Sequence, residues 1–237
     1  MTPPDDAQTR VAARFPGAAT LGLLVPPGSR PLPATALADV AWTTEHLELQ
    51  ALTGRTEDRR VLATLWWYSA SLVLLGPALA GLVAGRALSA RLEDTTLHVV
   101  GDLPWAATAT ASTGDVVTEL RGSLAAVVAT VAEAGGVREA PLRAIATDAL
   151  ANKLLALGRA RGDAPAVTAL AAPLAREAGL PAPRFVEAGG QLFTRRASCC
   201  QIWRVPHEVL CTSCPRRDPA ERQVLLEDTA ERMLSWG

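Results

Sequence analysis

All four cysteines of this 237-residue chain lie in one stretch of sixteen residues, from Cys199 to Cys214. Cys199 and Cys200 are adjacent, and Cys211 and Cys214 form a Cys-x2-Cys pair ten residues later. Four cysteines placed at random in a chain of this length would rarely cluster so tightly. The spacing is therefore the most informative feature of the sequence, and any fold of this chain has to place these four thiols in one region.

Disulfide bonds are the least favoured use of the four thiols. The sequence from Met1 to Arg10 has no basic segment followed by an apolar one, as a signal peptide would have, so we expect a cytoplasmic protein. Reducing compartments seldom keep structural disulfides. Adjacent residues also have Cα atoms about 3.8 Å apart, which is shorter than the usual lower limit of ~4.4 Å for a bridge.

Zinc and a [2Fe–2S] cluster are the two remaining uses. A Cys-x2-Cys pair is the common half-site of a four-cysteine zinc module. The Cys199-Cys200 half lacks the intervening turn, however, and neighbouring side chains of an extended strand point to opposite faces. A [2Fe–2S] cluster also takes four thiolates, and its two irons spread the ligand positions further apart. The spacing by itself leaves both interpretations open.

The stretch from Arg195 to Pro215 resembles the C-terminal signature of the FhuF-like ferric-siderophore reductases, which bind [2Fe–2S] through Cys-Cys-x10-Cys-x2-Cys. Ser198 before the cysteine pair, Trp203-Arg204 between the pairs and Pro215 after the last cysteine also agree with that family. Thr212 departs from it, because glycine is frequent there and would ease a tight turn.

The resemblance implies an iron–sulfur oxidoreductase in which Cys199, Cys200, Cys211 and Cys214 hold a [2Fe–2S] cluster. Its substrate would be Fe(III) in a siderophore, typically a hydroxamate, and its product Fe(II) released in the cytoplasm. Hard hydroxamate oxygens hold Fe(III) far better than Fe(II), so one electron loosens the complex. The electron would come from an external donor such as a ferredoxin or a flavin reductase.

Two other functions are alternatives to this iron–sulfur oxidoreductase. The first is a zinc-stabilised four-cysteine binding module without redox activity. The second is a cluster-bearing regulator, which would need a DNA- or partner-binding element, and no helix-turn-helix with a basic face is evident. The sequence contains no Gly-rich nucleotide loop and no Ser-His-Asp or paired-carboxylate pattern, so we expect no catalytic residue separate from the cluster.

Basic and aromatic residues flank the cysteines. The arginines are candidates for steering an acidic donor or an anionic chelate and for raising the cluster potential, or else for solvating the surface. The tryptophan is a candidate for shielding the cluster from water, and the histidine for donating a hydrogen bond to a sulfur. These candidates are Arg195, Arg196, Trp203, Arg204, His207, Arg216 and Arg217.

Composition favours an α+β fold that is mostly α-helical. Hydrophobic residues make up 49% of the chain but aromatic residues only 4%, which is typical of packed helices rich in Ala, Leu and Val. We expect one domain: a body over 1–183 and a cluster-binding segment over 184–237 packed on it. A net charge of −1 argues against nucleic-acid binding.

The local patterns predict individual elements. Residues 1–10 read as frayed, 20–25 as a short strand, 26–33 as a turn-rich loop and 95–110 as a β-hairpin. Short extended pieces around Gly189-Gly190 lead into the cysteines. Helices are expected over 34–52, 115–134, 139–160, 164–178 with a kink at Pro173, and 219–235.

The segment from Val61 to Gly85 has no charged residue and is long enough to span a bilayer. We favour a buried central helix, or two helices broken at Gly76-Pro77, because one end carries several hydroxyl groups and the chain has no second span. Peripheral membrane contact stays open as an alternative.

Overall fold

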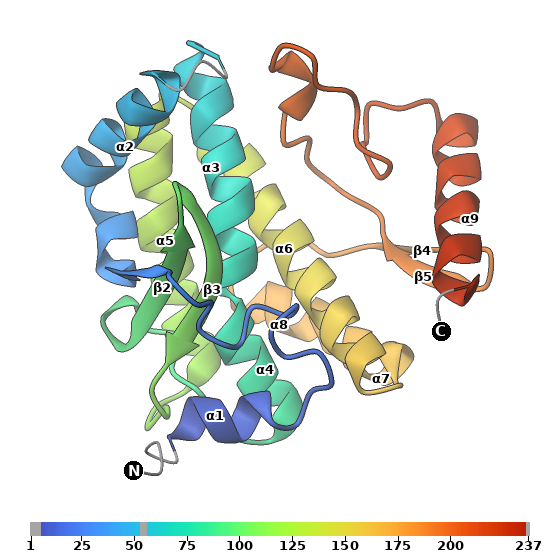
Figure 1. Ribbon diagram of the computed structural model, residues 1–237, viewed down its shortest axis with the longest axis horizontal. Coiled ribbons are helices and arrows are strands. Elements are labelled where there is room, and N and C mark those ends of the chain that lie inside the picture. Colours follow the sequence, from blue (N-terminus) through green and yellow to red (C-terminus); the bar gives the residue numbers. More distant parts are fainter. Residues whose placement is uncertain (1–5, 53–55, 236–237) are drawn as a thin grey trace.

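The computed structural model describes residues 6–52 and 56–235, and Figure 1 shows their arrangement. Helices dominate. A three-stranded antiparallel sheet lies against the helical body, and a two-stranded hairpin lies near the C-terminal end of the chain. The predicted α+β class, mostly α-helical with a small sheet, is confirmed.

The longer helices are α2 (Val40–Leu52), α3 (Arg59–Leu74), α4 (Gly76–Ala84), α5 (Val116–Gly135), α6 (Glu139–Ala160) and α9 (Pro219–Ser235). The shorter ones are α1 (Ala7–Ala12), α7 (Ala164–Thr168), α8 (Ala171–Glu177) and the 3-10 turns η1 (Ala34–Ala38), η2 (Leu92–Asp94) and η3 (Ile202–Arg204). The strands are β1 (Arg30–Pro33), β2 (Thr95–Val100), β3 (Leu103–Ala109), β4 (Phe185–Ala188) and β5 (Gln191–Thr194).

The long apolar stretch forms α3 and α4 at the centre of the body. The side chain of Asp58 accepts hydrogen bonds from the first backbone amides of α3, and Pro77 opens α4. By length and composition Arg59–Ala84 could cross a membrane, but 61% of its most apolar window is buried. Trp67 is fully buried and donates to the carbonyl of Leu142 in α6 at 2.8 Å. The prediction of two buried helices broken at Gly76-Pro77 is confirmed, because α3 ends at Leu74 and α4 begins at Gly76.

The sheet has the strand order β1-β2-β3, and all its pairings are antiparallel. The predicted hairpin over 95–110 is confirmed as β2 and β3. The predicted loop over 26–33 is wrong at its end, because β1 adds to the edge of the hairpin, where prolines such as Pro31 are tolerated. The predicted strand over 20–25 is also wrong. Gly22 has a left-handed φ of 70° and the region is a series of turns.

Three other predicted elements need correction. Residues 7–10 are not frayed but start α1, which Asp6 caps by accepting from the amide of Thr9; residues 1–5 lie outside the described residues. The helix over 34–52 is divided into η1 and α2, because Asp39 is extended. The helix over 164–178 breaks before Pro173, between α7 and α8. The helices predicted over 115–134, 139–160 and 219–235 are confirmed.

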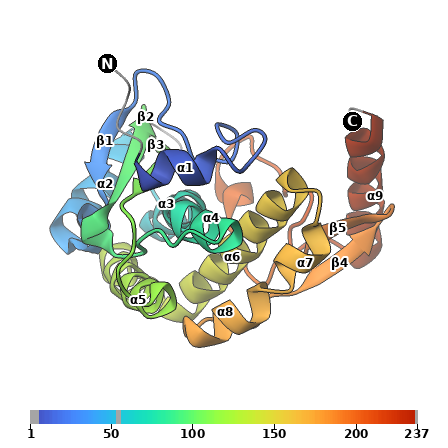
Figure 2. The same ribbon diagram turned by 90° about the horizontal axis from the view of Figure 1, so that it is seen from below.

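Two apolar cores are present. The large one runs through the body, whereas β4, β5 and α9 share a small one made of Ala188, Phe193, Leu226 and Ala230. Figure 2 shows α9 standing away from the body, beyond the hairpin. Arg159 of α6 links the two parts, since it donates to the carbonyl of Leu192 and lies 5.5 Å from the centre of the Phe193 ring. The division at residue 183 stays a prediction.

Candidate functional site

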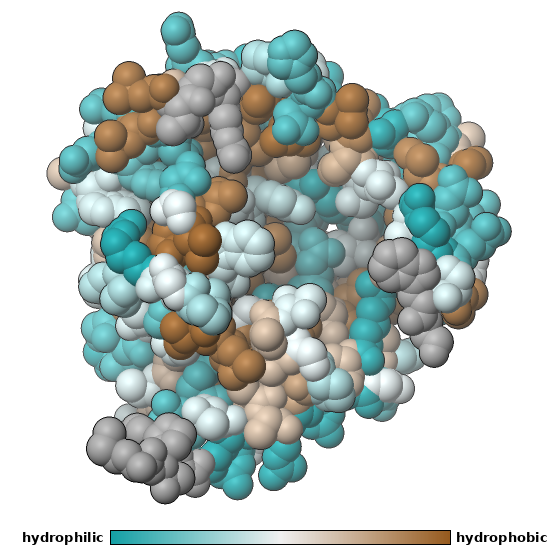
Figure 3. Space-filling view, in the orientation of Figure 1, coloured by the Kyte–Doolittle hydropathy of each residue, from teal (hydrophilic) through white to brown (hydrophobic). Residues whose placement is uncertain are grey.

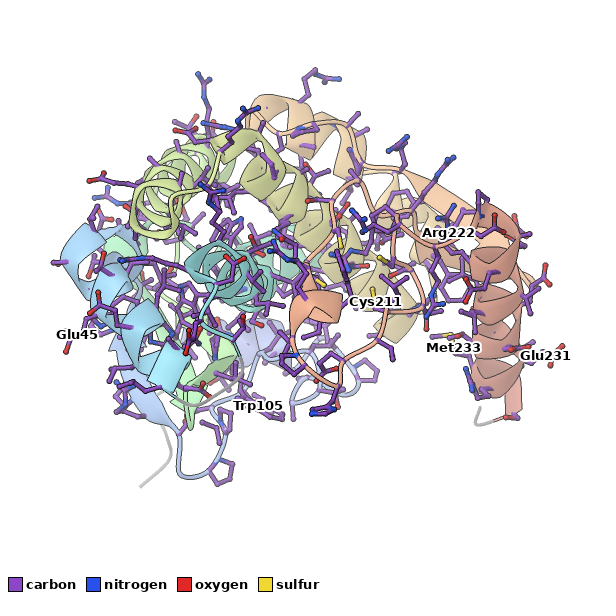
Figure 4. All side chains as sticks on the ribbon, turned by 90° about the horizontal axis from the view of Figure 1, so that it is seen from above. Glu45, Trp105, Cys211, Arg222, Glu231 and Met233 are labelled. Carbon is purple, nitrogen blue, oxygen red and sulfur yellow. The ribbon has the colours of Figure 1, made fainter. Side chains whose placement is uncertain are left out.

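The four cysteines lie on the loop that connects β5 to α9, which passes beside the helical body. Figure 4 shows the labelled Cys211 on this loop, between the body and α9. All four are free thiols. Cys200 and Cys214 are buried, and Cys199 and Cys211 are partly exposed. The surface is hollowed between the body and the C-terminal part on the face shown in Figure 3.

The thiols form two nested pairs, the outer two cysteines with each other and the inner two with each other. The sulfurs of Cys199 and Cys214 are 3.9 Å apart, and Cys200 and Cys211 are within hydrogen-bonding reach of each other. The backbone after the adjacent cysteines turns back toward the second pair. Gln201 has a left-handed φ of 64°, which turns the chain, and its amide donates back to the Cys199 sulfur at 3.4 Å. Neighbouring side chains can therefore meet different partners.

Arg196 lies beside the Cys200–Cys211 pair and is only 4% exposed. Its Nη1 donates to the sulfur of Cys211 at 3.4 Å and to that of Cys200 at 3.7 Å. Its guanidinium stacks over the ring of Tyr68 in α3, 4.7 Å from the ring centre. A fixed positive charge at this position favours thiolates and, with them, metal binding.

Asp148 of α6 holds the start of the cysteine loop. Its carboxylate accepts from the amides of Ala197 at 2.8 Å and Ser198 at 3.1 Å, and it lies 3.6 Å from Nε of Arg196. Both charged side chains of this ion pair are almost fully buried. Burial raises the pKa of Asp148, while the two amides and Arg196 oppose that rise. Sequence reasoning missed this residue; the one available signal was an acid on the otherwise apolar face of a predicted helix.

Helix α3 supplies a second set of contacts to the loop. The side chain of Gln201 donates to the hydroxyl of Thr64 at 3.1 Å. Arg204 pairs with Asp58, the residue that caps α3, at 2.6 Å. Thr64 and Tyr68 of the apolar stretch thus contact the cysteine loop.

The pKa values of the thiols differ strongly. The hydrogen bond with Cys211 lowers the pKa of Cys200 to about 5, against the effect of burial, and Arg196 adds to the lowering. The same hydrogen bond raises the pKa of Cys211. Burial raises the pKa of Cys199. Cys200 is therefore a thiolate at neutral pH, which is the form that binds metals.

These residues fit a [2Fe–2S] cluster in both donor type and spacing. Two thiolates on one tetrahedral metal, each bound at ~2.3 Å, lie about 3.8 Å apart, close to the separation of Cys199 and Cys214. Among residues 6–52 and 56–235 no three His, Cys, Asp or Glu side chains gather closely enough to hold a single ion. A cavity of about 280 Å³ adjoins Cys200 and Cys211, and Trp66, Tyr68 and Leu103 contribute to its lining.

The flanking candidate residues have different contact partners in the structure. Arg196 contacts sulfur, whereas Arg204 pairs with Asp58. Arg217 bonds to the carbonyls of Leu210 and Cys211 and to Glu221. Arg204 and Arg217 therefore have structural partners and are not free for docking.

The other candidates lie further out on the loop. Arg195 and Arg216 are exposed, and Arg216 stacks over Trp203, 4.8 Å from its ring centre. Trp203 is 38% exposed. His207 is exposed and has a left-handed φ of 66°; within the described part of the chain it makes no hydrogen bond to a sulfur. The roles proposed for Trp203 and His207 stay predictions.

Residues 196–216 match the family model of the FhuF 2Fe-2S C-terminal domain. The matched stretch contains all four cysteines and ends one residue after Pro215. This finding confirms the resemblance over the cysteine loop, at the place where the structure puts the two thiol pairs. No curated protein and no solved structure matches the chain.

Proposed function

We propose that this protein is a cytoplasmic ferric-siderophore reductase whose [2Fe–2S] cluster is held by Cys199, Cys200, Cys211 and Cys214. The observation that carries the proposal is the two nested thiol pairs inside a segment that matches a 2Fe-2S domain. Thiol pairs supply the two ligands that each iron of such a cluster needs.

A bound [2Fe–2S] cluster supplies one-electron transfer. The residues of the chain provide the ligands, the charge and the access. Arg196 balances the negative charge of the thiolates, and Asp148 and Tyr68 hold Arg196 in position. The partial exposure of Cys199 and Cys211 leaves the site within reach of a bulky chelate.

The substrate of the proposed reaction is Fe(III) in a siderophore, of the hydroxamate class. One electron leaves an external donor, such as a ferredoxin or a flavin reductase, and converts Fe(III) to Fe(II). No atom is transferred and no bond within the siderophore is broken. Fe(II) is a softer and less charged ion that hydroxamate oxygens hold weakly, so it dissociates. An Fe(II) acceptor downstream would pull the reaction forward.

The first test is the visible spectrum of anaerobically purified protein before and after dithionite, with iron, sulfide and zinc measured on the same sample. We expect bands that bleach on reduction and about two irons and two sulfides per chain. A colourless protein with about one zinc per chain would contradict the proposal and support the zinc-stabilised binding module.

The second test mixes reduced protein with a ferric hydroxamate, with and without a colorimetric Fe(II) chelator. We expect Fe(II) release that the chelator increases. The Ga(III) form of the same siderophore, which cannot be reduced, should compete for binding without reoxidising the protein. A reduced, iron-loaded protein that transfers no electron even with the chelator present would contradict the reductase function.

A further inference from the structure

A small pocket of about 140 Å³, separate from the cavity beside Cys200 and Cys211, is walled by guanidinium groups. Its residues come from the chain just before β4, the chain just after β5, the cysteine loop and α9. They are Arg184, Arg195, Arg196, Ala197, Ser213, Pro215 and Arg222. Figure 4 shows the labelled Arg222 between the cysteine loop and α9.

Three of these arginines carry positive charge that no neighbouring acid neutralises. Within the described residues, Arg184, Arg195 and Arg222 form no ion pair with a carboxylate. Among the described residues, Arg222 donates only to backbone carbonyls. Arginine stays protonated at every physiological pH, so the three charges are permanent.

Arg196, which also lines the pocket, has a donor unused by the described residues. Arg196 is 4% exposed, and among the described residues its Nη2 has no hydrogen-bond partner. Asp148 lies beside it and offsets its charge, but that carboxylate is occupied by two backbone amides. A buried donor without a partner is costly, so Arg196 would gain from an acceptor supplied by a bound group.

The pocket lies next to the Cys199–Cys214 pair. Ser213 and Pro215 flank Cys214 in the chain, and Arg222 donates to the Cys214 carbonyl at 3.4 Å. An anion bound here is therefore one residue away from a cluster ligand. The cavity beside Cys200 and Cys211 opens along α3 and β3 instead.

We propose that this arginine pocket docks an acidic patch on the surface of the protein that donates the electron; the inference rests on the proposed reductase function. The pocket has room for one carboxylate, and the exposed side chains of Arg184 and Arg195 reach beyond it toward further ones. Arginine forks bind carboxylates with two parallel hydrogen bonds, and such charge complementarity speeds encounter and fixes orientation.

Binding of an acidic [2Fe–2S] ferredoxin to the iron-loaded protein, measured by titration calorimetry, tests the proposal. The variant Arg184→Glu/Arg195→Glu reverses the two exposed charges of the pocket. The control Arg86→Glu/Arg121→Glu makes the same charge change at exposed arginines elsewhere. We expect about tenfold or greater loss of affinity for the pocket variant at low salt, little loss for the control, and convergence of all three proteins at about 0.5 M salt.

The rate at which ferredoxin reduces the protein gives a second readout. Stopped-flow reduction by the same ferredoxin should slow in the pocket variant, while reduction by the methyl viologen radical cation, which needs no acidic docking, should not slow. Equal ferredoxin affinity for the pocket and control variants would overturn the proposal.

The two proposals fail in different ways. A protein without iron and sulfide defeats the proposed function. A protein that is loaded with iron and reduces ferric siderophore, but binds ferredoxin independently of Arg184 and Arg195, defeats only the docking site.

Discussion

The helical body and the C-terminal segment are stabilised by different interactions. The body shares one large apolar core that includes helices α3 to α6 and the sheet. In the segment only four apolar side chains are grouped in a core of their own, and they lie between the hairpin and α9 rather than under the cysteine loop. The loop depends instead on Asp148, Arg196 and Gln201, which connect it to the body.

This difference shows how a rigid scaffold can carry a loop that has little core of its own. A loop with few apolar contacts unfolds locally at low cost unless polar contacts or a bound group hold it. Ligand binding to such a loop contributes directly to its folding free energy. We therefore expect changes in the loop to alter the cofactor and local order while the body stays folded.

The largest expected effect comes from Cys214→Ser, which removes one partner of the Cys199 pair. We expect at least about a tenfold loss of bound iron, since a ligand matters no less than the outer groups that orient it. Limited proteolysis should then cut within residues 195–218, while the helical content of the body is retained. Thr212→Ser, an exposed change in the same knuckle, is the control and should keep its iron. Full iron content in Cys214→Ser would contradict the ligand assignment.

The second effect is that of Asp148→Ala, which leaves Arg196 buried without its acid and two backbone amides without an acceptor. Breaking one side of a buried pair costs about 3–5 kcal/mol. The loss should appear as faster hydrogen exchange of the Ala197 and Ser198 amides and as a lower denaturation midpoint. The control on the same helix is Glu139→Gln, whose pair with Arg143 is solvent-exposed and worth at most about 1 kcal/mol. Equal effects of both changes would show that the loop is held in another way.

The third effect concerns the small core under α9. A Cβ on Gly189 would lie 2.7 Å from the Cβ of Ala230, and its φ is 53°. Gly189→Ala should therefore cost about 1–3 kcal/mol through overpacking and backbone strain, and it should loosen α9 alone. Gly190→Ala is a matched control with a positive φ but nothing within 4 Å of the added carbon. Thermal unfolding, monitored by proteolysis of α9, distinguishes the two variants. An equal loss of stability in both variants would rule out the clash.

The smallest effect is that of Asp58→Asn, which weakens the pair with Arg204 across the two regions. Both side chains are at least one-third exposed, so the pair is worth about 1 kcal/mol or less. Asparagine keeps the N-cap of α3, so the change isolates the ion pair. At low salt the melting temperature should fall by about a degree or two at most, which corresponds to a fraction of a kcal/mol in the free energy of unfolding. At high salt it should not fall at all. A large loss at high salt would show that Asp58 does more than pair and cap.

Much of the body could be predicted because its signals are local. The periodicity of residues 116–135 and 139–160 and the alternation around Gly101-Asp102 each depend on neighbours within a few positions, and those elements formed as predicted. The predicted strand over 20–25 failed for a tertiary reason: Gly22 takes a left-handed turn and its carbonyl receives the amide of Ala107. A contact over such a separation has no local pattern.

By itself the sequence determined that four thiols are available as ligands within sixteen residues, because this depends only on the spacing of Cys199 to Cys214 along the chain. Only the tertiary structure decided how the thiols pair and what surrounds them. Asp148 meets Ala197 and Ser198 across about fifty residues, and Arg184 and Arg222 join Arg195 in one pocket from both sides of the loop. The physical reason is that burial, charge pairing and hydrogen bonding depend on distance in space, which the chain sets only after it has folded.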